Sequence, residues 1–219
     1  MPDHYYTASP ASEHAPLEFE TAYRGHTLRF ETDRGVFSRL ALDRGTEILL
    51  AALPEALRGR VLDMGCGYGA LGVSLAKASP ACSLTMADIN ERAVSLADRN
   101  AARNGVAAET LQSDGFAALK GRQFDCVVTN PPIRAGKSVI YRMFADAAAA
   151  LAEGGTLWLV IRKQQGAPSA LRYLQTLFAE VTVVTRDAGY WVLRCAAPLV
   201  PGAAPVLPEK TETEWESGD

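Results

Sequence analysis

The sequence has little of what metal centres and disulfide frameworks need. It holds three histidines and four cysteines in 219 residues, and no two cysteines form a C-x-x-C pair. Widely separated cysteines predict reduced, mostly buried thiols, and histidines confined to the start of the chain have no ligand spacing. We therefore expect neither a metal site nor a disulfide. The residues concerned are Cys66, Cys82, Cys126, Cys195, His4, His14 and His26.

Long apolar runs are also missing. No stretch of the sequence approaches the ~20 apolar residues that span a bilayer, and the opening MPDHYYTASP lacks the charged start and apolar core of a signal peptide. An apolar content of 48% and a mean hydropathy of -0.01 are ordinary for a soluble protein. The length suits one α/β domain. These features predict a cytoplasmic protein without a membrane partner.

The sequence lacks the positive charge that is typical of nucleic-acid-binding proteins, because its formal net charge is -3. From Pro198 onward, five acidic residues face Lys210 alone, a local charge of -4. Taking -4 from -3 leaves about +1 for the rest of the chain, which permits an RNA partner without favouring one. The acidic residues are Glu209, Glu212, Glu214, Glu216 and Asp219.

Composition divides the chain into segments. Residues 1–16 and the Pro- and Glu-rich residues 198–219 are expected to be disordered, the second as a solvated acidic tail. Residues 17–31 alternate apolar and polar side chains around Arg24-Gly25, which predicts a β-hairpin. Apolar residues at helical spacing over 40–53 predict a helix that stops before Pro54. This extension, 17–53, precedes a core over 54–197, and 17–197 form one expected domain.

Strands and helices alternate in the core. This pattern predicts a Rossmann-like α/β fold, with a mostly parallel, seven-stranded sheet covered by helices on both faces. The last two strands follow one another without a helix between them. The expected strands are 60–64, 82–87, 106–111, 124–129, 155–161, 180–185 and 190–196, and the expected helices are 69–79, 90–103, 137–152 and 168–178.

The segment VLDMGCGYGALG, residues 61–72, carries the clearest functional signal. It reads as an apolar strand that ends in an acidic residue and runs through alternate glycines into a helix. Glycine adopts positive φ without strain and lets a ligand lie against the backbone. The amides at the helix start add partial positive charge. A small polar ligand is therefore expected here, whereas a bare turn would rarely need three such glycines.

Two ligands compete for this turn. Gly67, Gly69 and Gly72 spell the G-x-G-x-x-G of dinucleotide-binding proteins, with Asp88 about twenty residues on. Asp63 would repel a pyrophosphate but attract an ammonium and a sulfonium. Asp63 with Gly65, Gly67 and Gly69 resembles motif I of class I S-adenosylmethionine-dependent methyltransferases. That resemblance implies S-adenosylmethionine as cofactor and a sheet whose last two strands are antiparallel.

Further cofactor contacts are expected after the second and third strands. Asp88, followed by Ile89, lies where the carboxyl ends of parallel strands meet a ligand crevice, and its carboxylate can accept both ribose hydroxyls. Asp114, followed by Gly115, is placed to bind the adenine amino group. The plainer alternatives are that Asp88 is a turn residue before a helix capped at the following Asn90 and that Asp114 caps a short helix.

A second signal, Asn130-Pro131-Pro132-Ile133, follows the strand FDCVVT. By itself it could be a rigid turn, since proline fixes φ and removes a donor. Beside a methyl donor it resembles the N-P-P motif of amino-methyltransferases. The Asn130 side-chain oxygen and the Pro131 carbonyl would accept the two N–H bonds of an exocyclic amine, aim its lone pair at the methyl group and stabilise the developing positive charge. Asn130 would also border the cofactor.

The fourth position of this motif narrows the family. Ile133 replaces the aromatic residue favoured by protein-glutamine and DNA-adenine methyltransferases and offers only apolar contact to a base. The strings NPPIRAGK, 130–137, and DRGVFSR, 33–39, resemble the single-domain branch of the bacterial small-subunit rRNA (guanine-N2)-methyltransferases. The resemblance covers roughly residues 17–196 and implies RNA, either rRNA or an assembling small subunit, as the partner.

Basic and aromatic residues around the expected crevice complete the candidate site. Arg34, Arg39, Arg134 and Lys137 are candidate phosphate contacts, and ordinary surface charge is the alternative for each. Arg142, Arg162 and Lys163 fall in similar places. Phe37 would form an apolar lid over the cofactor, unless it packs in the core.

The sequence thus predicts an enzyme that methylates an exocyclic amino group of RNA, with guanine N2 of small-subunit rRNA as the expected target. Transfer would be direct and in line, without a metal, and the proton could leave to water. A monomer or weak dimer is expected. The alternatives are a methyltransferase for a protein glutamine or a small-molecule amine, and a non-catalytic RNA-binding or ribosome-assembly module.

Overall fold

The computed structural model describes residues 15–33, 36 and 41–199. The disorder expected before residue 15 and from residue 200 on lies outside the described residues, as do Arg34, Phe37 and Arg39.

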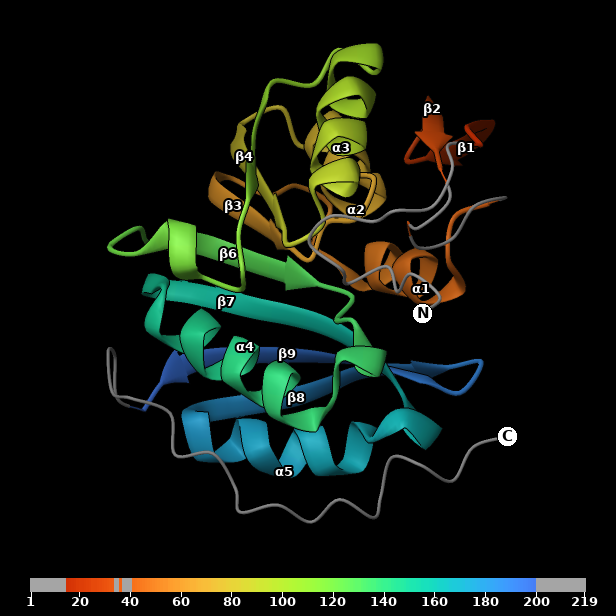
Figure 1. The fold of residues 1–219 in the computed structure, drawn as a ribbon. Helices are drawn as coiled ribbons and strands as arrows, with labels where there is room; N and C mark the ends of the chain where they lie inside the picture. Colours follow the sequence, from red (N-terminus) through yellow and green to blue (C-terminus); the bar gives the residue numbers. More distant parts are fainter. Residues whose placement is uncertain (1–14, 34–35, 37–40, 200–219) are drawn as a thin grey trace.

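The described chain begins with the expected hairpin, β1 (Leu17–Tyr23) and β2 (His26–Thr32). Arg24 and Gly25 join the strands with φ of 45° and 80°, the two positive values that a tight hairpin turn needs. The hairpin forms a sheet of its own and lies beside α3 (Glu91–Arg103) (Figure 1). Rings of Phe19, Phe30 and Tyr68 pack together beneath it, with centroids 5.7–6.0 Å apart.

Asn100 of α3 and Asn104, the C-cap residue of that helix, bind the hairpin to the core. The Asn104 side chain accepts from the Arg29 amide at 3.0 Å and donates to its carbonyl at 2.8 Å. The Asn100 side chain does the same with Glu31, at 2.8 Å each, and also donates to the Tyr68 carbonyl at 2.8 Å. On the edge of β2 that faces away from β1, these asparagines therefore provide the hydrogen bonds that a further strand would otherwise make.

The main sheet has seven strands in the order β5-β4-β3-β6-β7-β9-β8. The first five are parallel, and β9 is antiparallel to both β7 and β8, as expected for strands that follow one another directly. The strands are β3 (Gly59–Met64), β4 (Cys82–Asp88), β5 (Ala108–Gln112), β6 (Phe124–Thr129), β7 (Leu151–Arg162), β8 (Phe178–Asp187) and β9 (Tyr190–Pro198).

Helices cover both faces of this sheet and enclose two apolar clusters (Figure 1). One cluster joins the sheet to α1 (Arg44–Ala52), α2 (Ala70–Ala78), α3 and the hairpin. The other joins it to α4 (Lys137–Ala149), α5 (Ala167–Leu177) and the short turn η1 (Ala117–Leu119). Further 3-10 turns are η2 (Ile133–Ala135) and η3 (Lys163–Gln165). The predicted α/β fold is confirmed.

Some expected elements had boundaries wrong by several residues. The helix expected over 40–53 begins at Arg44, after its N-cap Asp43. The helix expected over 137–152 ends at Ala149, and β7 begins at Leu151 instead of residue 155. The run of alanines before Leu151 continues the apolar pattern past the helix end, so periodicity could not mark it. Gly154, with φ 74°, lets the chain pass through the start of β7 in a conformation that other residues rarely adopt.

Candidate active site

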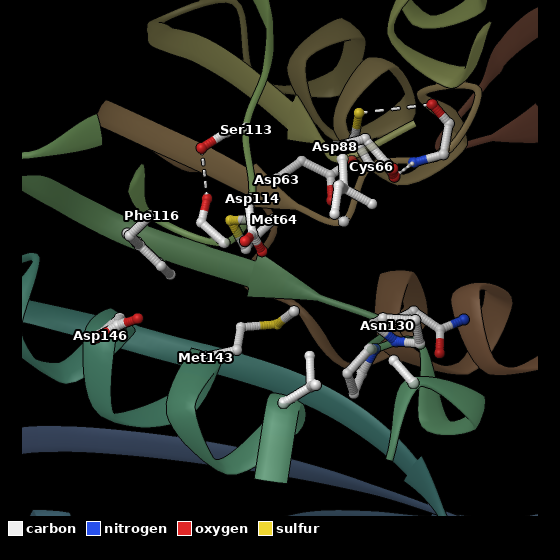
Figure 2. A pocket seen from close by; sticks show the side chains of 18 of the residues that line it. Asp63, Met64, Cys66, Asp88, Ser113, Asp114, Phe116, Asn130, Met143 and Asp146 are labelled. Carbon is white, nitrogen blue, oxygen red and sulfur yellow. Dashed lines mark hydrogen bonds between the residues drawn. The ribbon is translucent and has the colours of Figure 1, made fainter. Parts of the chain in front are cut away.

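A cavity of about 1400 Å³ opens at the carboxyl ends of the parallel strands, the edge at which α/β sheets bind ligands. It exceeds the ~300–1,000 Å³ of most single-ligand pockets and so has room for two ligands. Figure 2 shows Asp63, Cys66 and Asp88 on one side of it and Asn130 across the opening. The expected site residues that line it are Asp63, Gly65, Gly67, Asp88, Ile89, Asp114, Gly115, Asn130, Pro131, Pro132, Ile133 and Arg134.

The glycine turn has the geometry that the sequence predicted. Gly65, Gly67 and Gly69 have φ of 71°, 56° and 87°, in the left-handed region that favours glycine. A side chain at Gly69 would lie 3.2 Å from the Ala97 main chain, whereas one at Gly67 would meet nothing within 4 Å. Gly69 precedes α2 without a side-chain cap of its own, so the first-turn amides of Ala70 and Leu71 remain available to a ligand, while that of Gly72 is bound by Asp63.

The sequence predicted that the Asp63 carboxylate would face the ligand, and the structure places it differently in part. Asp63 lines the cavity, but its side chain is only 1% exposed and its Oδ2 accepts from the Gly72 amide at 2.8 Å. A side chain at Gly72 would lie 3.0 Å from this oxygen. Gly72 therefore serves close packing of α2, which accounts for the third glycine of the apparent dinucleotide pattern. Burial raises the pKa of Asp63 to about 7, against the lowering effect of the Gly72 amide.

The carboxylate of Asp88 binds the glycine turn through hydrogen bonds. Its Oδ2 accepts from the Gly67 amide at 2.8 Å, and its Oδ1 accepts from the Asn90 amide at 2.9 Å. Burial raises the pKa of Asp88, while these amides lower it. Asn90 does cap α3, accepting from the amides of Arg92 and Ala93. Asp88 is thus both a turn-forming residue and part of the cavity wall, where each oxygen keeps a lone pair for a further donor.

The loop that follows β5 forms another part of the cavity wall. Asp114 is exposed at the cavity, and its carbonyl accepts from the Ala117 amide at 3.1 Å to start η1. Ser113 donates to the Gly115 carbonyl at 2.6 Å and stiffens the loop. The ring of Phe116, 9% exposed, lines the cavity beside them, as an apolar surface for a flat ring. Sequence reasoning missed Phe116, although QSDGF carries it two residues after Asp114.

Asn130 is held by α1, which is far from it in sequence. Its Nδ2 donates to Asp43 Oδ2 at 2.9 Å and to Thr46 Oγ1 at 3.1 Å. Asp43 is also the N-cap of α1, because the same oxygen accepts from the Thr46 amide at 3.1 Å. Both N–H bonds of the Asn130 amide are therefore used, and its oxygen is left as the acceptor at the cavity. Asp43 and Thr46 line the cavity too.

The two prolines shape the rest of this loop. The Pro132 carbonyl accepts from the Ala135 amide at 2.8 Å, which forms η2. Within the described residues, no hydrogen bond reaches the Pro131 carbonyl. The N-P-P turn thus presents two oxygens from adjacent residues, one from a side chain and one from the main chain. Such a pair fits a donor with two N–H bonds.

Among the expected basic residues that the structure describes, some line the cavity and others do not. Arg134, Arg142 and Arg162 line it, whereas Lys137 and Lys163 do not. Arg134 and Arg162 are exposed, and Arg142 pairs with Asp146 at 3.8 Å. The ammonium of Lys137 lies 5.4 Å from the centre of the Tyr141 ring. Over the described ranges there is no group of three or more His, Cys, Asp or Glu residues suited to a metal ion, and no helix has the length and hydropathy to cross a membrane.

A glycine turn with two acidic residues, facing an N-P-P turn across one cavity, defines a class I S-adenosylmethionine-dependent methyltransferase. The comparisons agree with this class. Residues 27–194 match the family model of the methyltransferase small domain. The chain belongs to that family, and its cofactor is S-adenosylmethionine.

Relatives add detail. The uncharacterized protein YbxB of Bacillus subtilis is 41% identical over 197 residues, which is 89% of this chain and 98% of YbxB. Ribosomal RNA small subunit methyltransferase C of Shewanella oneidensis is 39% identical over 158 residues, 70% of this chain but 44% of that protein. The chain spans less than half the length of that relative.

Among solved structures, the 16S rRNA N2 G1207 methyltransferase (RsmC) of Thermus thermophilus, in complex with AdoMet and guanosine, has a TM-score of 0.75 and 30% identity. The match covers 86% of this chain and 52% of that one. A methyltransferase of Pyrococcus furiosus, 21% identical with a TM-score of 0.58, shares the fold. The resemblance predicted from the two sequence motifs is confirmed.

Proposed function

We propose that this protein methylates the exocyclic N2 amino group of a guanine in small-subunit rRNA. The observation that carries the proposal is the Asn130 amide at the cavity wall, whose nitrogen is bound by Asp43 and Thr46, so that its oxygen is left as the acceptor for a ligand. An acceptor held this way favours an amine as substrate. The names of the rRNA methyltransferase relatives support guanine in rRNA as the source of that amine.

The cofactor half of the cavity would hold S-adenosylmethionine. Its sulfonium supplies an electrophilic methyl group and leaves as a neutral thioether. Gly65 and Gly67 line the cavity and let the backbone approach the ligand, Gly69 shapes the turn behind them, and Asp63, when ionised, attracts the positive charge of the ligand. Asp88 would accept the ribose hydroxyls, and Asp114 with Gly115 would border the adenine.

The N-P-P turn would prepare the amine. An exocyclic amine of a base is a weak nucleophile, because its lone pair is delocalised into the ring. Hydrogen bonds to Asn130 Oδ1 and the Pro131 carbonyl would turn that lone pair toward the methyl group. The same two oxygens stabilise the positive charge that builds on nitrogen. Ile133 and Pro132 would contact the base, and Arg134 would contact phosphate.

The proposal is tested by comparing rRNA from a deletion strain with that of its parent. Mass spectrometry of nucleosides should show the loss of one N2-methylguanosine, and the purified protein should restore it on small subunits or rRNA from the deletion strain. Unchanged rRNA, together with transfer of label from radioactive S-adenosylmethionine to protein or a small amine, would contradict it. Absence of S-adenosylmethionine binding in calorimetry would favour a non-catalytic RNA-binding role.

A further inference from the structure

The turn between β8 and β9 forms a second depression beside the cavity. It has a volume of about 490 Å³ and shares Tyr190 with the cavity. The turn lies at the carboxyl end of β7, where Arg162 pairs with Tyr190 and the Lys163 amide donates to the Gly189 carbonyl at 2.8 Å. The depression is lined by Lys163, Arg186, Asp187, Ala188, Gly189, Tyr190 and Trp191.

The cations here have no acidic partner. Arg162, Lys163 and Arg186 are exposed, and among the described residues none of them pairs with a carboxylate. The carboxylate of Asp187 is bound by Arg44 at 2.8 Å, so it does not cancel their charge. Several cations elsewhere on the described surface are neutralised, in the pairs Arg29–Glu20, Arg60–Asp125, Arg99–Glu31, Arg103–Glu18 and Arg122–Glu109. Arg58, Lys120, Arg134 and Arg172 are exposed and also have no carboxylate partner among the described residues, but none of them lines this depression with its aromatic rings.

Two of these cations lie over aromatic rings. The Arg162 guanidinium is 5.2 Å from the centre of the Tyr190 ring, and that of Arg186 is 4.4 Å from the centre of the Trp191 ring. Tyr190 and Trp191 are consecutive in β9, so their side chains leave the strand on opposite sides, but both line the same depression at the hairpin end. A guanidinium held against a ring keeps its planar fork available for phosphate or for stacking on a base.

One of the pairs reaches the proposed reaction centre. A side chain at Gly45 would lie 3.0 Å from Tyr190 Cε1 and 3.4 Å from Asn130 Nδ2. The Tyr190 ring and the Asn130 amide therefore flank Gly45, and its lack of a side chain keeps the space between them open. If a base were bound at Asn130, the adjacent nucleotide of the RNA strand would lie close to Tyr190 and Arg162.

We propose that this surface, formed by Arg162, Lys163, Arg186, Tyr190 and Trp191, binds the single-stranded RNA next to the target nucleotide. The inference rests on the proposed function. A base must leave its stack to enter a cavity, which leaves its neighbours unstacked. Rings and guanidinium groups replace that stacking, and the cations contact the phosphates. A duplex offers no free base faces, so this hairpin surface selects single strands.

The test compares two double variants of the full-length protein. K163A with R186A removes two cations of the hairpin surface, and R29A with R60A removes two cations that are ion-paired elsewhere. The probe is a fluorescein-labelled single-stranded RNA oligonucleotide, titrated in fluorescence anisotropy at several salt concentrations, with the matching duplex in parallel. Calorimetry with S-adenosylmethionine checks that both variants are folded and bind the cofactor.

The first variant should bind the single strand about tenfold more weakly, with a salt slope lower by about 1 to 2, because each phosphate contact contributes about 1. The second should bind like the parent. Equal losses in both variants, no loss in the first, or equal affinity of the parent for duplex and single strand would overturn the inference.

A methylation assay on rRNA from the deletion strain separates this inference from the proposed function. Higher KM for rRNA in K163A with R186A, at the parent's KM for S-adenosylmethionine, supports the surface. If the parent methylates rRNA and the variant has an unchanged KM, the surface is refuted while the proposed function stands. If the parent binds single strands through the surface but methylates no RNA, the proposed function is refuted instead.

Discussion

The hydrogen bond between Asp43 and Asn130 yields a prediction about rate. Replacing Asp43 by Ala removes the carboxylate that accepts from Asn130 Nδ2 at 2.9 Å and leaves Thr46 Oγ1 as the remaining acceptor. The amide of Asn130 can then rotate and exchange its oxygen and nitrogen, because one neutral hydrogen bond no longer determines its orientation. In the exchanged orientation it presents a donor to the amine, which cannot accept it productively.

The size of the effect follows from the kind of bond lost. A hydrogen bond to a charged group contributes about 1.5–3 kcal/mol, and about 1.4 kcal/mol corresponds to tenfold in rate. If the bond acts on orientation in the transition state, kcat should fall about 10- to 150-fold in Asp43→Ala. The KM for S-adenosylmethionine should stay unchanged, since the glycine turn is untouched. Single-turnover methylation of rRNA from the deletion strain measures both quantities.

A matched variant separates catalysis from helix stability. Asp43 also caps α1, and losing an N-cap costs about 1 kcal/mol. Asp43→Ser keeps a good N-cap but has no carboxylate to reach Asn130, so it should retain the parent's Tm and lose kcat as Asp43→Ala does. A kcat within about twofold of the parent in Asp43→Ser, or a loss confined to the KM for S-adenosylmethionine, would refute the orienting role.

Further outcomes are expected at Asp63, Gly69 and Arg24. Burial raises the pKa of Asp63 to about 7, and the cofactor is cationic, so the calorimetric affinity for S-adenosylmethionine should rise as pH increases through about 7. Asp63→Asn should flatten that pH dependence. If the variant keeps the pH profile of the parent, Asp63 is not its cause. The same shift makes the folded protein bind more protons than the unfolded chain between about pH 4 and 7, so the stabilisation from Asp63 is full below that window and is lost as pH rises through it. Gly69→Ala should lower Tm more than Gly67→Ala, since both have positive φ but only the first meets the Ala97 main chain at 3.2 Å; equal shifts in a thermal melt would argue against that contact. Arg24→Ala should cost about 1–2 kcal/mol in urea unfolding, because its guanidinium donates to the three carbonyls that follow α1, and Arg24→Gln should recover little of it.

Much of the fold was predictable because local patterns and global structure agree. The buried strands read as short apolar runs, and the Arg24-Gly25 turn is visible between two alternating segments. The glycine turn was predictable for the same reason, since glycine adopts the positive φ found at Gly65, Gly67 and Gly69 far more readily than other residues do. Where the pattern had no end signal, as in the alanines before Leu151, the boundary was missed.

The orienting residues of the site could not be predicted in this way. Asp43 is separated from Asn130 by 87 positions, and in the sequence it lay inside the helix expected over 40–53, with no sign of a role at the site. Its hydrogen bond to Asn130 depends on how α1 packs against β7 and β9, which is a matter of tertiary structure. The burial of Asp63 has the same origin, since it follows from the close approach of α2 at Gly72. The residues proposed to bind the ligands could be recognised in the sequence, but the contacts that orient their side chains could not.

The separate hairpin sheet has a dynamic consequence. Because β1 and β2 form a sheet of their own, held to the core by side chains that include those of Arg24, Asn100 and Asn104 and three rings, the pair can open without breaking a ladder of the main sheet. Opening releases Asn100, which also holds the Tyr68 carbonyl inside the glycine turn. We therefore expect hairpin fluctuation and cofactor occupancy to be coupled. Hydrogen exchange of the β2 amides should slow when S-adenosylmethionine binds, although the ligand lies in the cavity and not under the hairpin.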